Sequence, residues 1–90
     1  MPDVILGTVI NVVDGDTFDV NVTQYLNTNN NTYNNQERIR IAGIDTPEIP
    51  SVLGFRAKSH LEQSLFGKNV KLTVRARDDY RRLVCDVKKL

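Results

Sequence analysis

Two short acidic motifs stand out in this chain, because each follows a segment with the pattern of a β-strand. The first is Asp14-Gly15-Asp16-Thr17 and the second is Asp45-Thr46-Pro47-Glu48. Carboxylates at the ends of neighbouring strands can converge on one hard cation, which prefers oxygen ligands. Arg40, on the strand that leads into the second motif, could hold a phosphate against that cation. This combination is suited to the hydrolysis of a phosphodiester bond.

The oxygen-rich motifs predict a calcium site. Ca²⁺ takes its ligands from carboxylates, backbone carbonyls and water. Asp16 and Asp45 offer carboxylates, and Thr46 offers a backbone carbonyl next to Asp45. Zinc is not expected, because the chain has a single histidine and a single cysteine and cannot pair either type.

The arginines divide into two groups. Attack on a phosphodiester builds negative charge on the phosphate oxygens, and guanidinium groups held in place beforehand stabilise that charge. Arg40 lies on the polar face of its predicted strand, and Arg82 stands at the start of the last one. These two are predicted to bind the phosphate. Arg38, Arg75 and Arg77 are predicted to be solvated surface charges.

The elements that must position these residues are five strands and one helix. Five segments are β-branched or alternate apolar with polar residues, which is typical of strands. Ala57, Leu61 and Leu65 recur every four residues and predict a helix over residues 54–66. The predicted strands cover residues 4–13, 18–22, 37–44, 69–76 and 83–87. This order predicts a mainly β protein, a five-stranded OB-fold Greek-key barrel with its helix between strands 3 and 4.

The core of such a barrel is expected to be thin, because a chain of this length buries only about 60–65% of its unfolded surface. Phe18, Phe55 and Phe66 are expected to fill it together with aliphatic residues, since the chain has no tryptophan. Cys85 is expected to be a small buried hydrophobic residue on the last strand. Residues 23–36 are rich in Asn and Thr and predict a flexible loop or a hairpin tip.

The length predicts a single domain over residues 1–90. Residues 1–50 carry two basic and seven acidic side chains, whereas residues 51–90 carry ten basic and four acidic ones. One half is thus suited to gathering cations and the other to facing anions, with chance segregation as the alternative. No apolar run approaches a membrane span, and no secretory signal is visible. We expect a cytoplasmic protein that does not enter a membrane, with secretion as the alternative if a leader has been removed.

Taken together, the motifs resemble those of the staphylococcal nuclease, or thermonuclease-like, family. There an Asp-Gly-Asp-Thr junction, an Arg-x-x-x-x-Asp-Thr-Pro-Glu segment and a Tyr-Gly-Arg turn build one site. The corresponding residues here are 14–17, 40–48 and Tyr80-Arg81-Arg82. Gly54 and Ala57 match the glycine and alanine that open the family's first helix. Three motifs in the same order are a specific signal, and the similarity covers most of the chain.

The resemblance implies a metal site and a general base. Asp16 and Asp45 would bind Ca²⁺ through their carboxylates, and Thr46 would bind it through its backbone carbonyl. Asp14 would lie beside the metal site and contact its ligands. Glu48 would orient or deprotonate the attacking water.

The resemblance also implies a phosphate site. Arg40 and Arg82 would grip the phosphate, and Tyr80 would contact the substrate. Arg81, which stands where the family usually has glycine, could compete with Arg82 for the phosphate. The reaction implied is endonucleolytic and exonucleolytic cleavage of DNA and RNA that leaves 3′-phosphate and 5′-hydroxyl ends. We therefore expect a calcium-dependent nuclease that acts on single-stranded DNA or RNA.

Two departures from the family leave alternatives open. Arg56 stands where the helix-opening motif commonly carries an acidic residue, and family members continue beyond the fifth strand into helices that contribute substrate contacts. One alternative is a non-catalytic module of the same fold that binds nucleic acid or a protein partner. Another is a barrel too short to act alone. A monomer or weak dimer is expected in each case.

Overall fold

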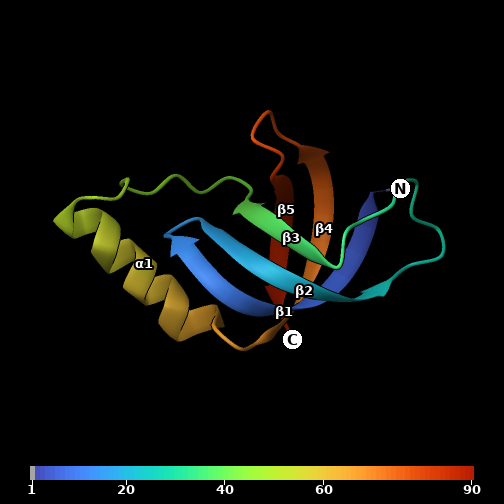
Figure 1. Ribbon diagram of the computed structural model, residues 1–90, viewed down its shortest axis with the longest axis horizontal. Helices are drawn as coiled ribbons and strands as arrows, with labels where there is room; N and C mark the ends of the chain where they lie inside the picture. Colours follow the sequence, from blue (N-terminus) through green and yellow to red (C-terminus); the bar gives the residue numbers. More distant parts are fainter. Residues whose placement is uncertain (1) are drawn as a thin grey trace.

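Five strands close into a barrel in the computed structural model, which describes residues 2–90 (Figure 1). The order around the barrel is β1-β2-β3-β5-β4; β3 and β5 pair in parallel, and the other neighbours pair antiparallel. The elements are β1 (Asp3–Asp14), β2 (Thr17–Tyr25), β3 (Gln36–Ile41), α1 (Val52–Leu65), β4 (Asn69–Arg77) and β5 (Leu83–Lys89). The predicted OB-fold barrel, with its helix between strands 3 and 4, is confirmed. No helix among the described residues is long and apolar enough to cross a membrane.

Strand β1 is long enough to pair with two neighbours at once. Ile5 lies opposite Tyr25 of β2 and also opposite Leu72 of β4. The register with β2 shifts at Gly7, where a Cβ atom would lie only 2.7 Å from the carbonyl oxygen of Asn21. Glycine is therefore required where the strand bends to close the barrel.

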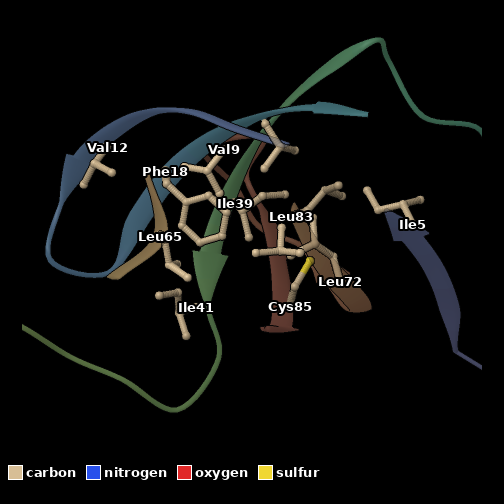
Figure 2. Close-up of a cluster of buried hydrophobic side chains, with 12 residues drawn as sticks. Ile5, Val9, Val12, Phe18, Ile39, Ile41, Leu65, Leu72, Leu83 and Cys85 are labelled. Carbon is tan, nitrogen blue, oxygen red and sulfur yellow. The ribbon is translucent and has the colours of Figure 1, made fainter. Parts of the chain in front are cut away.

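The hydrophobic core lies inside the barrel, with Phe18 at its centre and Leu65 of α1 closing one end (Figure 2). Cys85 is fully buried among these side chains, as expected. The prediction that Phe55 and Phe66 fill the core is wrong, because these side chains are 52% and 55% exposed. Phe55 lies off the helical stripe that ends at Leu65, on a side of α1 that faces away from the barrel, and Phe66 caps the C-terminal end of the helix.

The Asn-rich segment is shorter than expected and is tied to the start of β1. Strand β2 continues to Tyr25, which leaves residues 26–35 as the loop. The buried carboxylate of Asp3 accepts hydrogen bonds from the Tyr33 hydroxyl at 2.6 Å and from the backbone N–H groups of Asn30 and Asn31 at 2.7 and 3.0 Å. The Tyr33 hydrogen bond is the largest of the effects that lower the pKa of Asp3. The loop packs at the end of the barrel away from α1 (Figure 1).

The segment between β3 and α1 is locked to the first turn of the helix. The Ser51 hydroxyl accepts a hydrogen bond from the N–H of Gly54 at 2.9 Å and donates one to the carbonyl of Glu48 at 2.7 Å. A Cβ atom on Gly54 would overlap that same carbonyl oxygen. Glycine at position 54 therefore lets the helix start close to Glu48, and the N-cap fixes the backbone that carries the Glu48 side chain.

Candidate active site

Hydrogen bonds connect three residues of the first acidic motif in the turn between β1 and β2. The N–H of Asp16 donates to Oδ1 of Asp14 at 3.0 Å, and the Thr17 hydroxyl donates to Oδ1 of Asp16 at 2.9 Å. A Cβ atom on Gly15 would lie 2.5 Å from Cβ of Ala57 in α1. The turn is thus pressed against the helix, which explains why glycine and alanine stand at these two positions.

The two carboxylates of this turn have opposite pKa shifts. Burial raises the pKa of Asp14, and its contact with Asp16 raises it further. Burial also disfavours ionisation of Asp16, but hydrogen bonds with Asp14, Thr17 and Thr46 and the charge of Arg40 outweigh it and lower the pKa of Asp16. Asp16 therefore loses its proton first and is the carboxylate prepared to hold positive charge.

The second acidic motif meets the first around Asp16. Thr46 donates to Oδ2 of Asp16 from its backbone N–H at 3.3 Å and from its hydroxyl at 3.2 Å. Nη2 of Arg40 lies 3.5 Å from Oδ2 of Asp16 and 3.7 Å from Oδ1 of Asp45. The structure thus brings Asp16, Asp45, Thr46 and Arg40 into one cluster.

Arg40 stands between the two carboxylates predicted to bind a metal. Its Nη1 donates to the carbonyls of Ile41 and Ile44, which hold the guanidinium in this place. The carboxylate of Asp45 is accessible to a ligand from solvent, because its side chain is 98% exposed. Within residues 2–90, no three His, Cys, Asp or Glu side chains gather in a group that could hold a metal ion. The oxygen donors suit a hard cation, but that cation would share both carboxylates with Arg40.

A cleft of roughly 370 Å³ lies beside this cluster and is lined by four segments of the chain, one of which is β3 with Arg38. Glu48 enters it from the segment before α1, Tyr80 and Arg82 from the β4–β5 turn, and Asp14 and Thr17 from the β1–β2 turn. The Thr17 hydroxyl also lies 3.5 Å from Nη1 of Arg82. This hydroxyl, to which no role was given from the sequence, therefore links the cleft arginine to Asp16.

Asp78 holds Arg82 in place and was also missed from the sequence. Its carboxylate accepts from the backbone N–H of Arg82 at 2.8 Å and from Nε of Arg82 at 2.7 Å. It also accepts from the N–H of Tyr80 at 3.0 Å, which closes the turn. Burial raises the pKa of Asp78, but the contacts with Arg82 and Tyr80 outweigh it and lower the pKa overall. An Asp that opens a turn is a recognised signal, yet it does not reveal which side chain it will bind.

The two other predicted substrate residues differ in position. Tyr80 is 81% exposed, and its ring centroid lies 5.3 Å from Cζ of Arg82. Arg81 has a φ of 65°, the left-handed conformation that favours glycine, and it does not line the cleft. Its carbonyl accepts a hydrogen bond from Arg77 at 2.9 Å. Arg81 therefore adopts the backbone conformation that glycine favours, at the position where the family usually has glycine.

Arg77 is exposed at the surface, as predicted, but it also pairs with a carboxylate that is buried. Its two terminal nitrogens lie 3.1 and 3.2 Å from the carboxylate oxygens of Glu37, whose side chain is only 3% exposed. Glu37 alternates with Ile39 and Ile41 along β3, so it lies on the inward face of that strand. Arg38 and Arg75 are exposed as expected, and each pairs with an aspartate on a neighbouring strand.

Two comparisons with known proteins bear on the family of this chain. No family model matches the chain. Among curated proteins, micrococcal nuclease of Shigella flexneri is 37% identical over 76 residues, which cover 84% of this chain. The chain spans 38% of the length of that relative. Because this similarity runs through most of the chain and the barrel is the one that its motifs predict, the chain belongs to the staphylococcal nuclease-like family.

Proposed function

We propose that this chain is a calcium-dependent nuclease that hydrolyses phosphodiester bonds in single-stranded DNA or RNA. One observation carries the proposal: Glu48 and Arg82, from distant parts of the chain, line the same cleft. A carboxylate that can accept a proton from water thus shares a cleft with a guanidinium that can hold a phosphate. The similarity to micrococcal nuclease supports the same class of reaction.

In this proposal the arginines bind and orient the phosphate. Asp78 holds Arg82 through Nε. The terminal nitrogens of Arg82, one of which lies near the Thr17 hydroxyl, would then be available to contact the phosphate. Arg40, which lies beside Asp16 and is not among the residues that line the cleft, would contact a second phosphate oxygen. Both guanidinium groups stabilise charge that grows as the phosphate is attacked, so each contributes more to the transition state than to substrate binding.

Glu48 is proposed to accept the proton of the attacking water. It is exposed in the cleft, while its backbone is fixed by the N-cap of α1. Asp16 and Asp45 would hold Ca²⁺ through their carboxylates together with the carbonyl of Thr46. Asp14 would hold Asp16 in position through the hydrogen bond that it accepts from the Asp16 N–H. When bound, the ion supplies positive charge that lowers the barrier to attack on the phosphate.

The proposal is tested by incubating the protein with single-stranded DNA and RNA oligonucleotides, with and without Ca²⁺. We expect cleavage that a chelator abolishes and that Asp16→Asn or Glu48→Gln lowers at least about a hundredfold. Asp86→Asn is the matched control, because Asp86 is an exposed aspartate paired with Arg75, outside the cleft. No cleavage at micromolar protein with ample Ca²⁺ would contradict the proposal.

A second candidate is a non-catalytic module that binds single-stranded nucleic acid. The position of Arg40 favours it, because this guanidinium already pairs with the two carboxylates that a cation would need. Binding that needs no metal, weakens steeply with added salt and leaves the strand intact would support this candidate. Light scattering of the same samples reads the oligomeric state, for which we propose a monomer or weak dimer.

A further inference from the structure

A polar ladder crosses the outer face of three strands next to the cleft. Asn11 of β1, Asp19 of β2 and Arg38 of β3 lie opposite one another in the sheet. Nδ2 of Asn11 donates to Oδ2 of Asp19 at 3.2 Å. Arg38 donates to the same carboxylate from Nε at 2.8 Å and from Nη2 at 3.2 Å. The guanidinium of Arg38 is therefore held in one orientation by a bidentate ion pair with Asp19, and Asn11 holds the carboxylate of that pair in place.

Arg38 forms the boundary between two hollows in the surface. On one side it lines the cleft with Glu48, Tyr80 and Arg82. On the other side it lines a smaller hollow of roughly 290 Å³ with Asp19 and residues 36–37. A strand of nucleic acid that leaves the cleft along β3 would pass over Arg38.

The spacing along β3 also suits a nucleic acid backbone. Arg38 and Arg40 are two residues apart and on the same face of the strand, so they are separated by about 7 Å along it. Successive phosphates of an extended single strand are spaced by a similar distance. The ion pair with Asp19 uses Nε and Nη2 of Arg38 and leaves Nη1 available for another acceptor. The side chain is 52% exposed, so a ligand can reach it.

Building on the proposed nuclease function, we infer that Arg38 binds the phosphate next to the one that is cut. The site would then recognise an oligonucleotide backbone across at least two phosphates, and not a single phosphate ester. Arg38 acts on substrate binding, since it is directed to a phosphate at which no charge develops. This sets it apart from Arg40 and Arg82, whose role lies in the reaction.

The test compares Arg38→Ala with Arg75→Ala on two ligands. Arg75 is the matched control: it lies on a strand, is 60% exposed and pairs with Asp86 through the same two nitrogens, but it is outside the cleft. The ligands are a dinucleoside monophosphate, which has one phosphate, and an eight-residue single-stranded oligonucleotide. Binding is followed by fluorescence anisotropy in calcium-containing and calcium-free buffer, and cleavage is followed as kcat and KM.

We expect Arg38→Ala to weaken oligonucleotide binding about tenfold and to raise KM by a similar factor, with kcat unchanged. The slope of log affinity against log salt should fall by about 0.7, the value for one phosphate of a single strand. Binding of the dinucleoside monophosphate should stay the same, and Arg38→Lys should recover part of the loss. Arg75→Ala should match the unmodified protein throughout.

The inference is overturned if Arg38→Ala behaves like Arg75→Ala on the oligonucleotide, or if it weakens both ligands equally. It is also overturned if the unmodified protein binds neither ligand. If the protein binds the oligonucleotide with the expected Arg38 effect but does not cut it, the nuclease proposal fails, and Arg38 keeps its assigned role as a contact to a second backbone phosphate. The two proposals therefore fail on different results.

Discussion

Removal of the Arg77 guanidinium is expected to destabilise the barrel, because it leaves the buried carboxylate of Glu37 without a countercharge. Glu37 is 3% exposed at its side chain, and Arg77 supplies two of its hydrogen bonds, at 3.1 and 3.2 Å. Asn34 supplies two more, from its N–H at 2.8 Å and its side-chain amide at 3.2 Å. Breaking a buried ion pair costs about 3–5 kcal/mol. Because the Arg77 side chain is itself 39% exposed, water can replace part of the lost contact, and we expect Arg77→Met to cost about 2–3 kcal/mol.

Urea unfolding followed by circular dichroism measures this loss, with Arg75→Met as the control. The Arg75–Asp86 pair has side chains 60% and 51% exposed, and breaking it should cost about 1 kcal/mol or less. For a domain of this size, the Arg77 variant should melt about 10–20 °C lower. The double variant Glu37→Gln with Arg77→Met should regain at least half of the loss, because a neutral amide needs no countercharge. Equal losses for Arg77→Met and Arg75→Met, or no recovery in the double variant, would refute the reasoning.

Three further predictions concern single side chains. Asp78→Asn should lower kcat/KM on an oligonucleotide about tenfold without unfolding the protein, because it removes the charge that orients Arg82; an unchanged rate would show that Arg82 needs no such support. Arg81→Gly should raise the free energy of unfolding in urea by about 0.5–1 kcal/mol, since φ is 65° there, and a loss of stability would contradict this. Burial raises the pKa of Cys85 from 9.0 to about 12, so the unfolded chain loses this proton first as the pH rises. Above pH 9 the stability advantage of the unmodified protein over Cys85→Ala should therefore shrink by about 1.4 kcal/mol per pH unit, and an advantage that stays constant to pH 11 would rule this out.

Most of the barrel could be predicted from the sequence, because alternation of apolar and polar residues is a local pattern. The segments predicted at residues 4–13 and 69–76 form β1 and β4 with ends that differ by only one residue. The end of β2 was missed, since Thr23, Gln24 and Tyr25 are all exposed and show no alternation. Tyr25 extends the strand because it lies opposite Ile5 of β1, a contact between residues far apart in the chain.

The residues of the site that belong to a sequence motif could be predicted. Contacts between residues on strands far apart in the chain could not. Asp16, Asp45 and Arg40 lie together as their motifs indicate. The ion pair between Arg77 and Glu37 joins two strands that are not neighbours in the barrel order, so no local pattern reveals it. Phe55 points outward because of how α1 is rotated about its axis. The spacing of apolar residues indicates only roughly which side of the helix faces the barrel.

The pairing of β5 has a consequence for how the chain is made. β5 joins β3 on one side and β4 on the other, so the ring stays open until residues 83–89 have left the ribosome. Until then, β3 and β4 each present an unpaired edge, and the half-finished sheet exposes its apolar inner face. The nascent protein is therefore most prone to aggregate after β4 and before β5 has left the ribosome, and a stop codon near residue 80 would yield an aggregating fragment.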